Sequence, residues 1–186
     1  MSLLRLAEWL ENTGGSTALR ESFYMYPLVE STHVVTLMLF LGLTFMMDLR
    51  LLGVTLQGVP ASAVVRRLRP WMLAGFTIMM LTGVLLFYAI PVRTYHSVWF
   101  RGKMVMLVLA GLNVWLFHSR VWQRVADWDL FHKPPRAARV AGAFSLALWA
   151  GIVISGRLIA YNWFDCDLQP QPAIVNFLAG CVVDAD

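Results

Sequence analysis

Glu30 and His33 are unusual because they lie inside a long apolar stretch, residues 26–53. Ionisable side chains at membrane depth are costly, and they usually mark functional sites with a partner nearby. A neutral imidazole can ligate haem iron, and a neighbouring carboxylate can accept and release protons. The pair therefore predicts a site in which His33 is a metal ligand and Glu30 handles protons.

The surrounding sequence has the composition of a membrane protein. Of its 186 residues, 59% are apolar and only 14% are charged, and the mean hydropathy is +0.63. Runs of about 20 largely apolar residues are long enough to cross a hydrocarbon core of about 30 Å. Such runs occupy residues 26–48, 70–90, 98–119 and 139–162. We expect an all-α integral membrane four-helix bundle that forms one domain, residues 1–186.

The two ends of the chain lie outside these runs. Residues 2–12 mix Leu and Trp with two glutamates, which is typical of a short interfacial helix and not of a cleavable signal. The tail, residues 163–186, contains Cys166 and Cys181. In an oxidising compartment these two could form a disulfide, which would contribute about 3 kcal/mol in the chain-entropy model. Two unpaired thiols are the alternative.

Lys and Arg are distributed unevenly between the two sides of the predicted bundle. Nine flank the first and third connections, and four lie on the other side. The nine are Arg50, Arg66, Arg67, Arg69, Arg120, Arg124, Lys133, Arg136 and Arg139, and the four are Arg5, Arg20, Arg93 and Arg101. Because cytoplasmic loops are enriched in Lys and Arg, both termini are predicted to lie outside. In a bacterial inner membrane, that side is the periplasm.

This orientation gathers polar residues from several helices in the outer leaflet. At about 1.5 Å per residue, Lys103 and Arg157 come close to the depth of His33, and His96 and Arg101 lie nearer the outer surface. Inward histidines in a membrane helix bundle are a common setting for haem b. We therefore expect His33 and His96 as axial ligands, with Arg101, Lys103 and Arg157 offsetting the haem propionates.

Other ligand arrangements stay open. Several methionines lie nearer His33 in depth than His96 does, so His/Met ligation or a five-coordinate haem is an alternative. These methionines are Met79, Met80 and Met106. A second site could use His118 and Asn113 near the inner end of the third run. A carboxylate-bridged di-iron site is excluded because the last three runs contain no Asp or Glu.

Polar and small residues also recur at helical spacing. On the first run, Thr36, Thr44 and Asp48 continue the face that carries Glu30 and His33, and such a stripe should face the bundle interior. The last run carries a row of small residues, Ala143, Ala147, Gly151 and Ser155, that favours close helix packing. Arg157 lies nearly opposite that row, so it could instead face a partner subunit.

Four segments of the chain resemble an uncharacterised family of bacterial four-helix inner-membrane proteins. They are YPLVESTH (26–33), DLRLLG (48–53), AGLNVWLFH (110–118) and SGRLIAY (155–161). The resemblance covers most of residues 3–163 and implies the fold and the inner-membrane location, but no activity. A more distant likeness is to the four-helix b-type cytochromes, although the second and fourth runs here contain no histidine.

Two functions are consistent with these patterns. The first is a membrane electron-transfer subunit that passes electrons between quinol and a periplasmic redox partner. The second is a non-catalytic subunit that anchors or assembles a larger membrane complex. A transporter has less support because no paired repeat is evident. No basic patch suggests nucleic acid, so the expected partners are the lipid bilayer, quinone and other protein subunits.

Overall fold

The computed structural model describes residues 3–130, 133–161, 164, 166 and 169–181, and every regular element within these ranges is helical. Four helices are long and apolar enough to cross a membrane. They are α3 (Met25–Leu52), α4 (Ala61–Ala89), α6 (Val98–Leu116, continued as helical turns to Asp127) and α7 (Arg136–Leu158, continued to Tyr161). The chain is thus a multi-pass membrane protein, and the expected all-α membrane bundle is confirmed.

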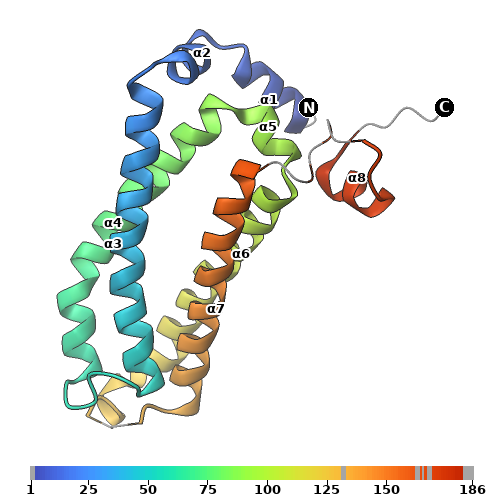
Figure 1. Cartoon of the computed structure of the whole chain (residues 1–186). Helices are drawn as coiled ribbons and strands as arrows, with labels where there is room; N and C mark the ends of the chain where they lie inside the picture. The colour runs from blue at the N-terminus through green and yellow to red at the C-terminus, as the bar shows by residue number, and fades with distance from the viewer. Residues whose placement is uncertain (1–2, 131–132, 162–163, 165, 167–168, 182–186) are drawn as a thin grey trace.

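Shorter helices gather mainly at one end of the bundle (Figure 1). This end, which we call the α5 end, carries α1 (Leu3–Glu11), α2 (Gly14–Glu21), α5 (Pro91–His96) and α8 (Ala173–Ala179). The opposite end, the loop end, carries the α3–α4 connection and two helical turns, η1 (Phe117–Val121) and η2 (Trp122–Asp127). A last turn, η3 (Ile159–Tyr161), follows α7. The helix predicted over residues 2–12 corresponds to α1.

Helix α3 is central because it packs against both α4 and α7, and α6 packs against the other side of α7 (Figure 1). Near the middle of the bundle the core is built from Phe40, Met79, Trp149 and Ile152. The rings of Phe40 and Trp149 meet edge to face at 4.8 Å between centroids. Many of the remaining apolar side chains are exposed, as expected where lipid covers them.

Helix α4 begins at Ala61, well before the predicted start at residue 70, so Pro70 lies inside the helix and not at its beginning. The helix start is stabilised from a distant segment. Asp129 accepts hydrogen bonds from the backbone N–H of Ser62 at 2.8 Å and from its hydroxyl at 2.5 Å. A carboxylate satisfies free N–H groups at a helix start and favours the helix dipole. This cap supports the turns that precede Pro70.

Arg50 shows how the loop end is held together. Its side chain is fully buried, with 0% exposure. Nε donates to the carbonyl of Val59 at 2.9 Å, and Nη2 donates to the carbonyl of Asp129 at 3.1 Å. The guanidinium therefore joins the end of α3 to two connections. From the sequence, Arg50 was used only to predict the membrane orientation; the structure shows that it also has a structural role.

The small-residue row predicted on the last membrane helix only partly faces the interior. Ala143 and Ala147 are exposed, whereas Ser155 is buried. A Cβ on Gly151 would lie 2.6 Å from Sδ of Met106, so this glycine permits the close approach of α6. The helix turns a different face inward because the large side chains of the core set its rotation.

Candidate site at His33 and Lys103

His33 on α3 lies against α4. Its Nδ1 is 3.0 Å from Oγ1 of Thr82, and the carbonyl of Met79 also interacts with the ring. A Cβ on Gly83 would lie 3.2 Å from Cε1 of His33. The absence of a side chain at Gly83 thus lets the half-buried imidazole pack directly against α4.

The hydrogen bonds of Thr82 favour one tautomer of His33, with the proton on Nδ1. Oγ1 of Thr82 donates its single hydrogen to its own helix, 2.8 Å from the carbonyl of Ile78. The same oxygen then accepts a hydrogen bond from Nδ1–H of the neutral imidazole. In this tautomer Nε2 keeps its lone pair. Metal-ligating histidines are commonly oriented in this way through their second nitrogen, and a free Nε2 can also accept a proton.

Lys103 on α6 provides a positive charge beside this histidine. The side chain is half-buried, and its Nζ would be 3.6 Å from a Cβ placed on Gly156 of α7. Its charge acts electrostatically on His33. No Asp or Glu in the described part of the chain lies within ion-pair distance of Lys103. Because an ammonium at membrane depth is costly without a counter-ion, the arrangement favours an anionic group near Lys103.

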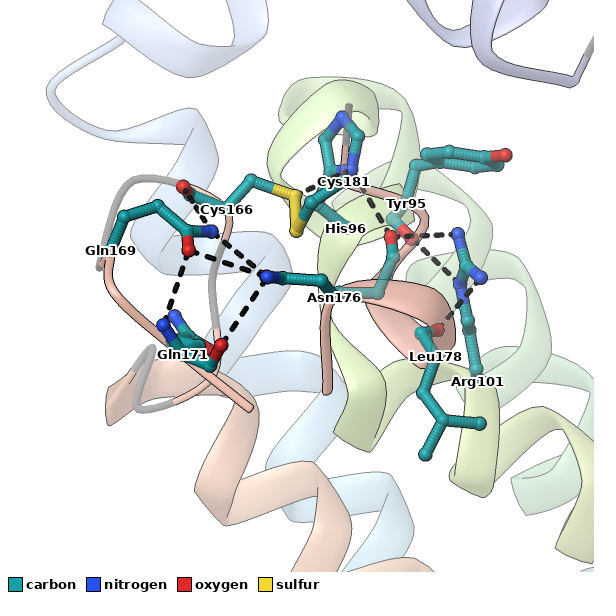
Figure 2. Close-up of a disulfide and its surroundings, with 10 residues drawn as sticks. Tyr95, His96, Arg101, Cys166, Gln169, Gln171, Asn176, Leu178 and Cys181 are labelled. Carbon is teal, nitrogen blue, oxygen red and sulfur yellow. Dashed lines mark hydrogen bonds between the residues drawn. A yellow bond between two sulfur atoms is a disulfide. The ribbon is translucent and has the colours of Figure 1, made fainter. Parts of the chain in front are cut away.

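A second histidine and a second cation lie at the α5 end, in a unit that we call the clasp: α8 and the Cys166–Cys181 disulfide, docked on His96 and Arg101 (Figure 2). The disulfide joins residues 15 positions apart. Nδ1 of His96 is 3.2 Å from Sγ of Cys166 and 3.2 Å from the carbonyl of Ala179. The ring therefore holds both the disulfide and the end of α8.

Arg101 completes the clasp. Its Nε donates to the carbonyl of Tyr95 at 3.1 Å, Nη1 to that of Leu178 at 2.8 Å, and Nη2 to that of Ala179 at 2.9 Å (Figure 2). The guanidinium carbon also lies 4.7 Å from the centroid of the Tyr95 ring. Each nitrogen of the guanidinium thus has a protein acceptor. Arg101 and His96 were predicted to hold a cofactor, and here they hold the tail.

Two other predicted outer-leaflet residues are exposed. Arg157 is exposed, and its Nη2 donates to the hydroxyl of Tyr161 at 3.1 Å. Glu30 is also exposed and interacts electrostatically with Tyr26 on the same helix. The prediction that the polar stripe faces inward is therefore wrong for Glu30, the residue nearest the helix start, where fewer neighbouring helices cover α3.

Lower on α3 the inward stripe is confirmed, because Thr44 and Asp48 are buried. The residues expected at a second site have separate environments. Asn113 donates from Nδ2 to the carbonyl of Ala141 at 3.0 Å, which links α6 to α7. His118 is exposed in the turn η1. The structure thus gives Asn113 a packing role between two helices and leaves His118 on the surface.

A comparison with known protein families places both His33 and Lys103 within a recognised sequence family. The family model described as "Family of unknown function (DUF6644)" matches residues 18–162. The chain belongs to this family. No curated protein and no solved structure matches it.

The DUF6644 match covers one of the two histidine sites completely and the other only in part. His33, Thr82 and Lys103 lie within the matched residues, whereas both cysteines of the clasp lie beyond residue 162. The family region therefore contains the whole His33 site. It contains only the α5–α6 half of the clasp.

Two residues of the His33 site were missed from sequence. Thr82 and Gly83 sit in the apolar run LTGVLL, where neither is distinguishable from ordinary helix-packing residues. One signal was available in the sequence: a polar side chain such as His33 on one membrane helix needs a polar partner, and space, on the adjacent antiparallel helix. Using it requires the register between α3 and α4, which hydropathy alone does not provide.

A haem can be tested against these residues. His33 fits an axial ligand, because Thr82 orients the imidazole through Nδ1 and thereby leaves Nε2 as the ligating nitrogen. Lys103 fits a propionate partner, because it lacks an acidic neighbour within the described ranges. His96, Arg101 and Arg157 are engaged by the protein itself. The donor set of this structure therefore fits a haem held by His33 and Lys103. The second axial ligand would be a residue other than His96, or the haem would have only one.

Proposed function

We propose that this protein is a membrane electron-transfer subunit that binds haem b at His33. The observation that carries the proposal is the hydrogen bond between Nδ1 of His33 and Thr82, which leaves Nε2 free for a metal. Bound haem would supply a one-electron redox centre inside the membrane. Quinol on one side and a periplasmic redox partner on the other are the proposed electron donor and acceptor.

Each residue of the site then has a defined task. Thr82 fixes the tautomer and the orientation of the imidazole, and Gly83 leaves the space that the ring needs. Lys103 offsets the negative charge of a propionate, and this attraction compensates for the cost of removing its ammonium from water. Glu30, exposed on the same helix near the α5 end, is placed to exchange protons with water or with a quinol headgroup.

We also propose that the α5 end faces the periplasm in a bacterial inner membrane. Nine Lys and Arg residues flank the connections at the loop end, against four at the other. The disulfide at the α5 end adds support, because structural disulfides persist in oxidising compartments. Access of a thiol-reactive or charged label to Cys-substituted loops in intact cells tests this orientation.

An optical spectrum of the full-length protein, purified in mild detergent from haem-replete bacteria, tests haem binding. We expect a reduced-minus-oxidised b-type band in the wild type and its loss in His33→Ala. The matched control is His96→Ala, which should keep the band because His96 contacts the clasp. A colourless, folded wild type would refute the proposal, as would a band that persists in His33→Ala.

A second function, an anchoring subunit of a membrane complex, is favoured by the clasp. Docking of the tail fixes α8 at the α5 end while Ile174 and Phe177 stay 67% and 82% exposed. A rigid helix with exposed apolar side chains suits a partner subunit. Affinity purification of the wild type should then recover a fixed partner, and Phe177→Ser should lose it. A wild type that purifies without partners would argue against this function.

A further inference from the structure

Three polar side chains are buried together nearer the loop end, away from the His33 site. Thr44 and Asp48 lie one turn apart on α3, and Ser145 lies on α7. Their exposed fractions are only 7%, 5% and 8%. The carboxyl group of Asp48 faces the hydroxyl of Ser145. We call these three residues the Asp48 cluster.

Two oxygen atoms of the Asp48 cluster have no protein partner. Oδ2 of Asp48 and Oγ1 of Thr44 are buried without a hydrogen bond in the described part of the chain. Other membrane-helix threonines differ: Thr32 and Thr82 donate to carbonyls of their own helices at 2.7 and 2.8 Å. Because buried hydroxyl and carboxyl oxygens are normally satisfied, the two atoms are available to a ligand.

The packing of α3 on α7 brings the cluster together. A Cβ on Gly142 would lie 3.1 Å from the carbonyl oxygen of Asp48, so the glycine allows the helices to approach closely. Further along, Phe40 meets Trp149 across the same interface. In this antiparallel register Thr44, midway between Phe40 and Asp48, falls opposite Ser145. Thr44 and Asp48 therefore lie on the α7-facing side of α3.

The charge of the cluster also lacks compensation from the protein. No Lys, Arg or His in the described part of the chain lies within ion-pair distance of Asp48. The nearest arginine in sequence, Arg50, directs its guanidinium to the carbonyls of Val59 and Asp129. A single buried carboxyl group thus faces the hydroxyl of Ser145, with no cation within ion-pair distance in the described part of the chain.

We propose that the Asp48 cluster binds a monovalent hard cation, Na⁺. An all-oxygen donor set selects a hard cation over a transition metal. One carboxylate balances one positive charge, whereas Ca²⁺ and Mg²⁺ sites usually recruit more carboxylates or several waters. Asp48 contributes the charge, and Thr44 and Ser145 contribute neutral oxygens. The Asp48 cluster is separate from His33, so a test of Na⁺ binding is independent of whether haem binds.

Thermal unfolding of the full-length protein in detergent tests this proposal through its intrinsic tryptophan fluorescence. At constant ionic strength and pH 8, replacing N-methylglucamine chloride with NaCl should raise Tm by roughly 5 °C once Na⁺ exceeds its Kd about 100-fold. Asp48→Asn should abolish this response. Thr44→Val and Ser145→Ala should each weaken the apparent Na⁺ affinity about tenfold, the cost of one lost interaction of about 1.4 kcal/mol.

Thr32→Val is the matched control, because its hydroxyl already binds its own helix, and it should keep the full Na⁺ response. If Asp48→Asn fails to fold, the Thr44 and Ser145 variants decide the question. Equal Tm values for the wild type in the two salts would overturn the proposal and leave an ordered water as the ligand. A Na⁺ response that survives in all three variants would overturn it too.

Discussion

The clasp and the His33 site each combine a histidine with a cation, yet their hydrogen bonding differs. In the clasp, Arg101 donates to three backbone carbonyls, and His96 contacts both Ala179 and the disulfide. At the other site, His33 contacts Thr82 through Nδ1, and the ammonium of Lys103 has no acidic partner within the described ranges. The same residue types thus have two different roles. Where the protein satisfies their hydrogen bonds, as in the clasp, they stabilise the structure; where it does not, they can bind a ligand.

Removing the disulfide should have the largest effect on the clasp. Replacing both cysteines, Cys166→Ser with Cys181→Ser, frees a loop whose closure is worth about 3 kcal/mol in the chain-entropy model. We expect the amides of α8 to lose hydrogen-exchange protection, while those around His33 keep theirs. Mass spectrometry of exchanged peptides measures both regions in one sample. Unchanged protection in α8 would show that the disulfide does not fix the tail.

Arg101→Ala should have the next largest effect, because it removes three hydrogen bonds to backbone carbonyls. At about 0.5–1.5 kcal/mol for each bond, partly screened by solvent, the docking of α8 should weaken by about 2 kcal/mol. Limited proteolysis of the tail should then accelerate roughly 30-fold. Arg93→Ala is the matched control, because Arg93 is an exposed arginine of α5. Equal rates in both variants would contradict a structural role for Arg101.

The fold was largely predictable from sequence because each membrane helix is defined by local hydropathy. Helix α3 was expected over residues 26–48 and runs from Met25 to Leu52. The start of α4 was missed because its cap, Asp129, comes from a distant connection. Hydropathy reports which residues can enter the membrane; it does not report contacts that stabilise the first turn of α4 at Ser62, well before Pro70.

The depth of the site residues in the membrane was predictable from sequence, but the direction in which each side chain points was not. Depth along each helix predicted that His33 and Lys103 belong together, and in the structure the charge of Lys103 acts electrostatically on His33. It could not show that Arg157 is exposed, since rotation about the helix axis depends on packing. Nor could it show that His96 and Arg101 are engaged by the tail, because α8 follows them by more than 70 residues in the sequence. These contacts are non-local, and a helical pattern carries no information about them.

The smallest expected effect, with the opposite sign, is that of Lys103→Met. Methionine keeps the length and apolar stem of lysine and removes an ammonium that has no described acidic partner. In ligand-free protein the variant should therefore be more stable by about 1 kcal/mol, since the desolvation cost of the charge is gone. Thermal unfolding followed by tryptophan fluorescence measures the change, with the exposed Lys133→Met as the control expected near zero. If Lys103→Met instead loses as much stability as Arg101→Ala, both cations are structural. The contrast between an unsatisfied site and a saturated clasp would then fail.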